Sequence, residues 1–431
     1  MRALSVFALT TLCTAWLNAQ APCSDAAKAT ALRELHHAQA AVLAIKQGEM
    51  DSGVPSTAVP ELRAFRAALA SAADAVMVCH PATDTRTVIA RDLQATLRTA
   101  APGMPETSAS AGDDATPVAG TLGNDVHGKV TELSTEPRLL GVELSSSVAC
   151  GTDSQLLVYG VRDGHWERRL RWGSALGVEK GLDASSELAG DFFLTGVVHV
   201  ARDANGWRVV LAHGTPWCTS RFSRIGLLVL APSADGEGHV VWQTRRDYSR
   251  DEFVPRMTAA GDTFELRLNA DAMAFDEAGF ERRVIYRYRV SAVKVERLEP
   301  IALNARGFVE EWLSMPWNEA QAQKADGNNE ALRRVHAMAQ ETGDADLYTS
   351  FAAGPVHACT TADRFQVQFD SQQEGTRAGT AGHEPSKPAQ HYFALRQVPD
   401  GYQLMSVSPK PDPTCAGPDL MHEAAGRGKP H

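Results

Sequence analysis

Two stretches of alternating apolar and polar residues decide the fold class. Residues 264–268 read Phe-Glu-Leu-Arg-Leu, and residues 284–290 read Val-Ile-Tyr-Arg-Tyr-Arg-Val. A period of two places successive side chains on opposite faces of a strand, so each stretch predicts a strand buried on one face. Such strands pair antiparallel, and the pattern extends from about residue 139 to residue 303. We therefore expect an antiparallel all-β domain over residues 136–303.

Recurring turns indicate how these strands are joined. Residues 162–166 read Arg-Asp-Gly-His-Trp and residues 203–207 read Asp-Ala-Asn-Gly-Trp, each with an aromatic residue shortly after a turn glycine. Residues 233–242 resemble the Asp-box turn of sialidase-like β-propellers, although Glu237 stands where that motif has glycine. The resemblance favours propeller-like hairpins, and a β-sandwich is the alternative. None of the catalytic residues of sialidases accompanies the motif.

Helical patterns precede the strands. Apolar residues recur at three- and four-residue spacing in residues 25–47, 60–79 and 84–99, which predicts a helical bundle over residues 20–99. Gly48, Gly53 and Pro55 separate the first two helices, so these should pack antiparallel and bring Cys23 beside Cys79. Residues 100–135 are rich in Ala, Pro, Gly, Ser and Thr and predict a flexible linker.

The last part of the sequence predicts a small α+β domain over residues 304–415. Helical spacing comes first, and strands are expected at residues 365–369, 392–397 and 402–407. Residues 416–431 read as a disordered tail. The whole chain is thus expected to be an α+β multidomain protein.

The beginning of the sequence predicts export. Residues 1–19 combine Arg2, an apolar run from Ala3 to Leu17 and a small residue, Ala19, at a plausible cleavage point, as in a secretory signal peptide. The run is shorter than the roughly 20 residues that cross a bilayer, and we expect no transmembrane segment in the mature chain. The expected location is periplasmic or extracellular.

Cysteine usage agrees with export. Removal of the signal peptide leaves six cysteines, an even number, as expected for a disulfide framework in an oxidising compartment. They fall in pairs along the sequence, which favours the bridges Cys23–Cys79, Cys150–Cys218 and Cys359–Cys415. None lies in a Cys-x-x-Cys pair, so we predict no metal site and no cofactor.

Charge and composition restrict the function classes. The 431 residues are 44% hydrophobic and 22% charged, with a formal net charge of −10. Such a protein is neither collagen, coiled coil nor wholly disordered, and its acidic balance argues against nucleic-acid binding. No Gly-x-Ser-x-Gly, His-Glu-x-x-His, P-loop or dinucleotide-binding motif is present, so no reaction is predicted from local signatures.

One loop region concentrates groups that could recognise a ligand. Residues 213–221 carry an imidazole, an indole, hydroxyls and a guanidinium, and residues 242–252 add aromatic and charged side chains. The predicted ligand-binding residues are His213, Trp217, Arg221, Asp247 and Tyr248. The sequence favours an exported, non-catalytic protein that binds an unknown protein or carbohydrate. A secreted hydrolase of glycans or esters is the alternative, with His213 as a base for Ser220 or Thr219 and Asp247 orienting it.

Arginines dominate the bases of the central region. The aromatic and arginine side chains of the charged run around Arg246 suit an anionic or sugar ligand, and the stripe Arg283, Arg287 and Arg289 is open to the same interpretation. Because this region has nearly equal numbers of acids and bases, we expect most guanidiniums to pair with carboxylates across strands in solvent.

Overall fold

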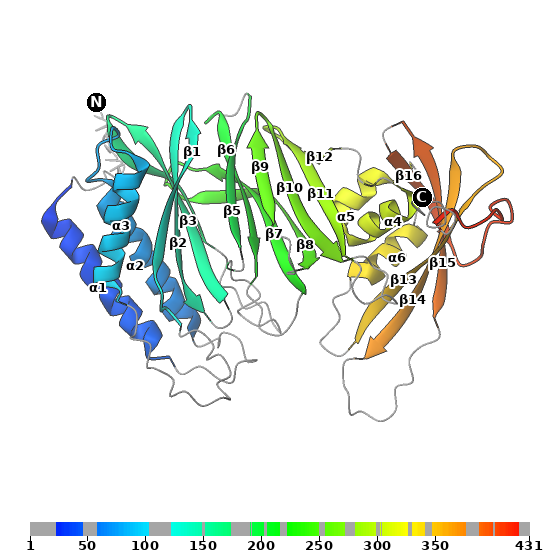
Figure 1. Ribbon diagram of the computed structural model, residues 1–431, viewed down its shortest axis with the longest axis horizontal. Helices are drawn as coiled ribbons and strands as arrows, with labels where there is room; N and C mark the ends of the chain where they lie inside the picture. The colour runs from blue at the N-terminus through cyan, green and yellow to red at the C-terminus, as the bar shows by residue number, and fades with distance from the viewer. Residues whose placement is uncertain are drawn as a thin grey trace, which may run out of the picture.

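The fold was analysed in a computed structural model of the protein. It describes residues 23–45, 58–102, 122–148, 151–173, 190, 192–201, 205–215, 222–249, 255–271, 281–298, 302, 304–325, 330–340, 347–375, 388–399 and 401–421. The predicted signal peptide, residues 1–19, lies outside these ranges. Within them the protein is β-rich and multidomain, with helices followed by antiparallel sheets (Figure 1).

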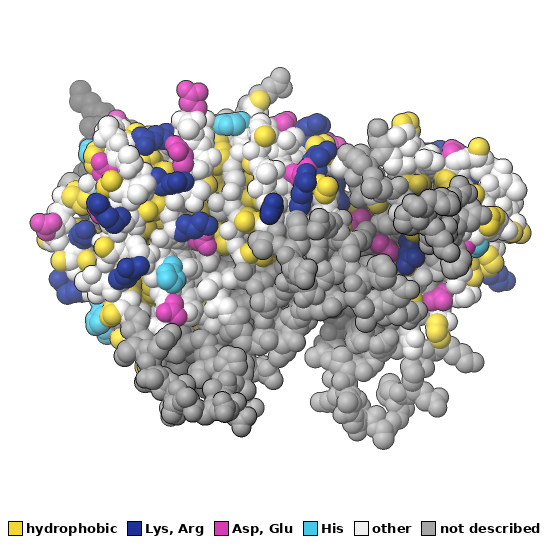
Figure 2. Space-filling model, viewed as in Figure 1, with side chains coloured by type: hydrophobic (Ala, Val, Ile, Leu, Met, Phe, Trp, Pro, Cys, Tyr) yellow, Lys and Arg dark blue, Asp and Glu magenta, His cyan; other side chains and the backbone are white. Residues whose placement is uncertain are grey.

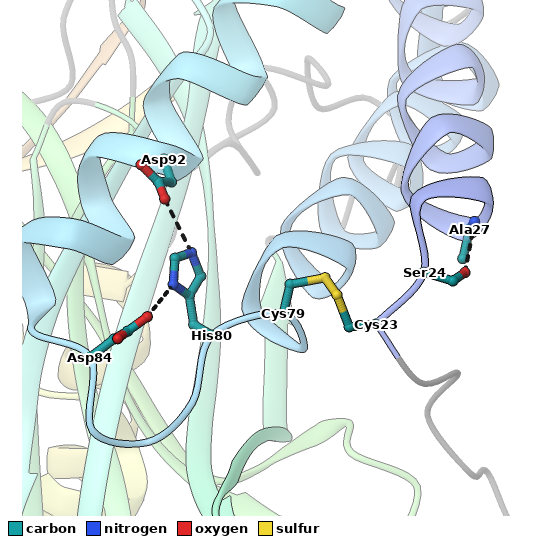
Figure 3. Close-up of a disulfide and its surroundings, with 7 residues drawn as sticks. All are labelled: Cys23, Ser24, Ala27, Cys79, His80, Asp84 and Asp92. Atoms are coloured by element: carbon teal, nitrogen blue, oxygen red, sulfur yellow. Dashed lines mark hydrogen bonds and ion pairs between the residues drawn. A yellow bond between two sulfur atoms is a disulfide. The ribbon is translucent and has the colours of Figure 1, made fainter.

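Three helices come first in the described residues: α1 (Asp25–Leu43), α2 (Val59–Met77) and α3 (Arg86–Ala100). Their positions confirm the helices predicted from apolar spacing. The side chain of Ser24 caps α1 by accepting from the backbone N–H of Ala27 at 3.1 Å. The bridge Cys23–Cys79 joins the start of α1 to the residues that follow α2, as predicted (Figure 3).

In the described part of the protein, each of four sheets contains four strands in sequential order, and every neighbouring pair of strands is antiparallel. The antiparallel pairing predicted from the period of two is therefore confirmed. Sheet A contains β1 (His127–Thr135), β2 (Arg138–Val148), β3 (Gly151–Arg162) and β4 (His165–Gly173). Sheet B contains β5 (Phe193–His199), β6 (Trp207–Gly214), β7 (Phe222–Pro232) and β8 (Gly238–Ser249). Sheet C contains β9 (Arg256–Ala260), β10 (Thr263–Asp271), β11 (Glu281–Val290) and β12 (Val295–Arg297).

The helices and the first three sheets form a stack with one apolar layer between successive members (Figure 1). Tyr159 of sheet A packs with the helices, whereas its neighbour in sequence, Val158, packs with sheet B. In the same way, Leu211 of sheet B packs with sheet A and Val210 packs with sheet C. Sheets A and B are buried on both faces because successive residues of a strand point to opposite sides.

Polar contacts fix α2 to sheet A. Arg66 and Asp153 form an ion pair, both with buried side chains, in which Arg66 Nε donates to Asp153 Oδ2 at 2.5 Å. The hydroxyl of Tyr159 donates to Asp74 at 2.8 Å, and Arg168 also pairs with Asp74. The helices at residues 20–99 therefore share their core with sheet A.

Strand β1 differs from the prediction, because it occupies residues assigned to the linker at 100–135. The stretch has little apolar character, and Val130 is its one buried side chain. Helix α3 packs closely on the strand at Gly128, where an added Cβ would lie 2.9 Å from side-chain carbons of Leu93 and Leu97. Glycine at position 128 allows the strand to approach α3 this closely. The stretch therefore forms a strand that packs against a helix, although it has few apolar residues.

The aromatic residues that follow these turn glycines are buried. Gly164 and Gly206 have positive φ angles of 81° and 71°, which glycine adopts without steric cost. Trp166 is the second residue of β4 and Trp207 is the first residue of β6. Their side chains are 1% and 4% exposed. Trp166 packs in the core shared by the helices and sheet A, and Trp207 packs in the layer between sheets A and B.

The C-terminal part packs helices on sheet D. Helices α4 (Ala305–Ser314), α5 (Trp317–Ala320) and α6 (Glu330–Gln340), with the 3-10 turn η4 (Gln321–Gln323), precede the sheet. Sheet D contains β13 (Leu347–Ala358), β14 (Arg364–Gly375), β15 (Ala389–Val398) and β16 (Gly401–Ser408). The predicted bridge Cys359–Cys415 is present and connects the two ends of this sheet.

Part of the predicted tail is held by the fold. The backbone N–H of Val356 donates to Asp419 at 3.0 Å, and Leu420 and Met421 pack against the core of sheet D. Residues 416–421 are therefore ordered against the sheet because Asp419 satisfies an edge-strand amide. The third predicted bridge, between residues 150 and 218, lies outside the described residues.

Two further properties concern the described part of the protein alone. None of its helices combines the length and apolar character needed to cross a bilayer. Nor does it bring three or more His, Cys, Asp or Glu side chains into a cluster that could hold a metal ion.

Candidate functional site

His213 lies at the end of β6 on the side of sheet B that faces sheet A. Its ring is 5.4 Å from the ring of Trp172 in β4, which in turn is 6.1 Å from Phe193. The paired residue on β7 is Gly226, and a Cβ at that position would overlap the imidazole. The ring therefore lies over a glycine between two sheets, with aromatic neighbours on the opposite side.

The surroundings of His213 keep it neutral. Burial lowers the pKa of this imidazole to about 4; the backbone of Gly214 favours the charged form, and the nearby Arg245 disfavours it. The side-chain atom Nδ1 is buried and makes no hydrogen bond of acceptable geometry to any described residue. A buried polar atom without a partner costs free energy, and such atoms occur where a ligand or a water supplies the missing bond.

The other predicted site residues are placed only in part. Trp217 and Arg221 lie outside the described residues. Asp247 and Tyr248 belong to β8, where their backbones pair with Arg224 and Ser223 of β7. Because His213 pairs with Gly226 and Gly226 pairs with Arg245, the backbone of Asp247 is two strands and two residues away from that of His213.

This register bears on what the predicted residues could do. Strands lie about 4.8 Å apart and rise about 3.4 Å per residue, so the two Cα atoms are separated by roughly 12 Å. A separation of this size accommodates a ligand that contacts both residues. A direct hydrogen bond between His213 and Asp247 would require the two side chains to extend across this Cα separation.

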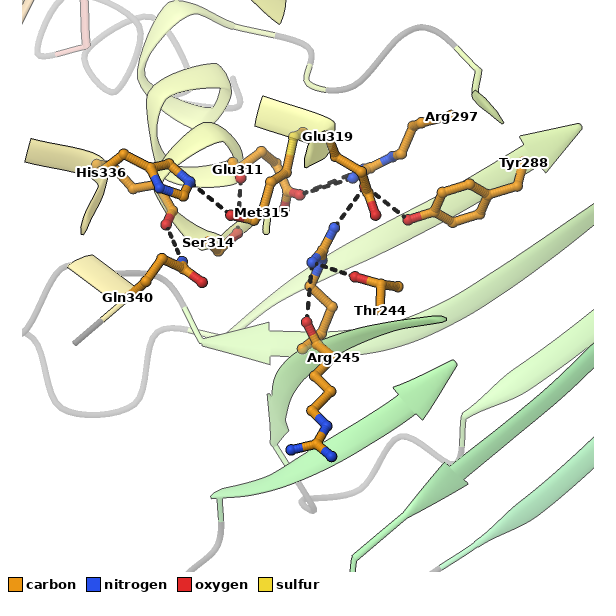
Figure 4. Close-up of polar contacts among 12 residues, drawn as sticks. Thr244, Arg245, Tyr288, Arg297, Glu311, Ser314, Met315, Glu319, His336 and Gln340 are labelled. Carbon is orange, nitrogen blue, oxygen red and sulfur yellow. Dashed lines mark hydrogen bonds and ion pairs between the residues drawn. The ribbon is translucent and has the colours of Figure 1, made fainter. Parts of the chain in front are cut away.

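A second group of functional side chains lies where sheets B and C meet α4 and α5. The junction cluster comprises Arg246, Tyr288, Arg297, Glu311 and Glu319 (Figure 4). Arg246 donates to Glu319 at 2.8 Å, and Arg297 lies 3.4 Å from Glu311. The hydroxyl of Tyr288 donates to Glu319 at 3.3 Å.

The charges of this cluster are removed from solvent. The side chain of Arg246 is 2% exposed and that of Glu311 is 1% exposed. Burial disfavours the charged form of Arg246, but Tyr288 and Glu319 keep its pKa above the ordinary value. Burial raises the pKa of Tyr288 to about 12. Each guanidinium also lies over the ring of Tyr286, with centroid distances of 5.5 Å for Arg246 and 4.5 Å for Arg297.

The charged run at residues 242–252 was expected to form ion pairs in solvent. This expectation is wrong for Arg246, whose side chain is buried. Its partner is a carboxylate of a helix rather than a cross-strand neighbour. Paired and fully charged groups are poor proton donors and acceptors at neutral pH, so the junction cluster is suited to holding the sheets and the C-terminal helices together. Trp312 and Met315 lie nearby but belong to the apolar core shared with sheet D.

Histidines elsewhere in the described residues also have polar partners. His80, next to the first disulfide, lies 2.7 Å from Asp84 through Nδ1 and 3.7 Å from Asp92 through Nε2 (Figure 3). His391 Nε2 lies 2.7 Å from the hydroxyl of Ser371. Ser371 is 3% exposed, so this hydroxyl is not placed to attack a substrate. Both arrangements orient side chains within the fold.

Comparisons with known proteins give no family. No family model matches the sequence, and no curated protein matches it. Among solved structures the protein is similar to one described as a BT0996 RGII complex, with 10% sequence identity, covering 68% of this protein and 88% of the other. The TM-score of this comparison is 0.23.

Proposed function

We propose that the protein is exported and binds a ligand without catalysis at the His213 end of sheets A and B. The signal peptide at residues 1–19 and the disulfides support export to a periplasmic or extracellular location. The proposed layout is a helical region at 20–99, a β domain at 136–303 and an α+β domain at 304–415. The β domain is propeller-like in this proposal, since each sheet is a four-stranded meander packed face to face with the next.

The observation that carries this proposal is the unpartnered Nδ1 of His213. A neutral imidazole with one free nitrogen can exchange a hydrogen bond with a hydroxyl or an amide. Trp172 and Phe193 supply aromatic surface beside it. Such a combination of apolar wall and few polar groups is typical of ligand sites, and it suits a carbohydrate hydroxyl or a peptide amide. Trp217, Arg221, Asp247 and Tyr248 complete the proposed site.

The hydrolase alternative receives less support from the geometry. A general base must come within about 3 Å of the hydroxyl from which it takes a proton. The pKa of about 4 makes His213 a weak base at neutral pH, and the Cα atom of Asp247, the residue expected to orient it, lies roughly 12 Å away. Hydrolysis is therefore the alternative outcome of the turnover assays described next.

The test compares the protein with its His213→Phe variant. Neutral oligosaccharides and short peptides are screened for an increase in unfolding temperature, and nitrophenyl esters and glycosides are tested for turnover. We expect a stabilising ligand whose effect is lost in His213→Phe, with no turnover. His199→Phe is the matched control, because His199 is an exposed histidine of the same sheet. Binding that His213→Phe leaves unchanged would contradict the proposal, and turnover lost in this variant would establish the hydrolase.

A further inference from the structure

The outer face of sheet C is open and rich in arginine. Sheet C ends the three-sheet stack, so one face packs against sheet B and no described residue of another sheet covers the other face. The guanidinium face comprises the outward residues Arg256, Arg267, Arg287 and Arg289, together with Glu265 and Ile285. Figure 2 shows dark blue side chains gathered over β9–β12.

Only part of this positive charge is neutralised on the face. Glu265 accepts from Arg287 of the neighbouring strand at 2.7 Å, which is the expected cross-strand pairing, and from Arg267 of its own strand at 2.6 Å; these bonds lower the pKa of Glu265. Arg289 lies 3.7 Å from Asp262 in a turn, and both side chains are about half exposed. Arg256 makes no ion pair with any described residue and lies directly opposite Arg267. Like charges in directly paired positions destabilise a sheet, so this placement is a cost that binding can offset.

The composition of the face indicates which kind of partner it fits. None of the strands β9–β12 contains lysine, although a surface that needs only positive charge can use either base. Ile285 lies among the arginines, directly opposite Arg267, and is 45% exposed. Protein interfaces are enriched in arginine, depleted in lysine and apolar at their centre. A polysaccharide has no comparable use for an exposed isoleucine.

We infer that the guanidinium face is a docking surface for a second protein whose surface presents carboxylates around an apolar centre. The rest of the molecule repels such a partner, since the formal net charge is −10. Arg287 and Arg267 are held in place by Glu265, so they are oriented before the partner arrives. The inference is independent of the proposed site at His213, which lies on the other side of sheet B.

The experiment uses the full oxidised protein and immobilised polymers of known chemistry. A random copolymer of glutamate and tyrosine represents the acidic protein surface, polyglutamate lacks the apolar part, and polygalacturonate represents an anionic polysaccharide. We expect tightest binding to the glutamate–tyrosine copolymer, weakened about tenfold by the double charge reversal Arg256→Glu and Arg289→Glu. Ile285→Ser should remove the preference over polyglutamate and leave polyglutamate binding unchanged.

Arg334→Glu is the matched control, because Arg334 is an exposed arginine of α6 with a side-chain exposure of 70%. The inference is overturned by equal or tighter binding to polygalacturonate, by an equal loss in Arg334→Glu, or by no binding to the copolymer. Unfolding curves of each variant separate loss of binding from loss of folding, and variants that unfold in one transition at or above the parental midpoint are compared.

Discussion

Arg246 of β8 and Glu319 of α5 form an ion pair at 2.8 Å although 73 residues separate them in the sequence. The pair joins the β stack to the C-terminal helices through two buried charges (Figure 4). Each charge is stabilised by the other, because both side chains are largely buried.

Replacement of Glu319 by Gln is therefore expected to lower the free energy of unfolding by about 3–5 kcal/mol, since it leaves the guanidinium of Arg246 buried without a carboxylate. Chemical denaturation measures the change. Glu330→Gln is the control, because Glu330 pairs with Arg334 on the exposed surface of α6 and should contribute less than about 1 kcal/mol. Equal effects of the two substitutions would show that the buried pair is not needed at the junction.

The contact between Gly226 and His213 predicts a specific steric effect. A methyl group in Gly226→Ala would overlap the imidazole, so we expect a loss of about 1–3 kcal/mol in unfolding free energy. In a His213→Ala background the same substitution should cost much less, because the overlapping ring is absent. If the two backgrounds gave the same cost, the ring would not lie over Gly226.

Stability is expected to depend on pH through His213. The unfolded state binds a proton at this residue near its ordinary pKa of 6.5, whereas the folded protein binds it at about 4. Between these values the unfolded state holds more protons, so stability is full above pH 6.5 and falls as the pH decreases towards 4. The total loss is up to about 3 kcal/mol. The difference between the wild type and His213→Phe, measured by denaturation from pH 7.5 to 4, isolates this contribution from the carboxylates; parallel curves would contradict it.

Local periodicity explains how much of the fold could be predicted. Apolar spacing located α1, α2 and α3, and the period of two located β10 and β11, because both signals depend on neighbouring residues. Strand β1 was missed because it pairs along its length with β2 and packs against α3 at Gly128, contacts that its own residues do not signal.

Long-range relationships explain what could not be predicted of the sites. His213 was singled out from the chemistry of its loop, but its burial depends on Trp172 of another sheet. The role of Arg246 depends on which alternate residues of β8 face the junction, and a register shift at Val229/Leu230 in the β7–β8 pairing complicates this alternation. Arg256 became part of a basic face only through its pairing with Arg267.

We expect the protein to mature where thiols oxidise, with each of its three parts closed by its own disulfide. Peptide mapping by mass spectrometry under non-reducing conditions, on protein purified from its native compartment, tests this expectation. It should find three links, Cys23–Cys79, Cys150–Cys218 and Cys359–Cys415, and a mature protein that begins near Gln20. Six free thiols, or links that join one part to another, would contradict it.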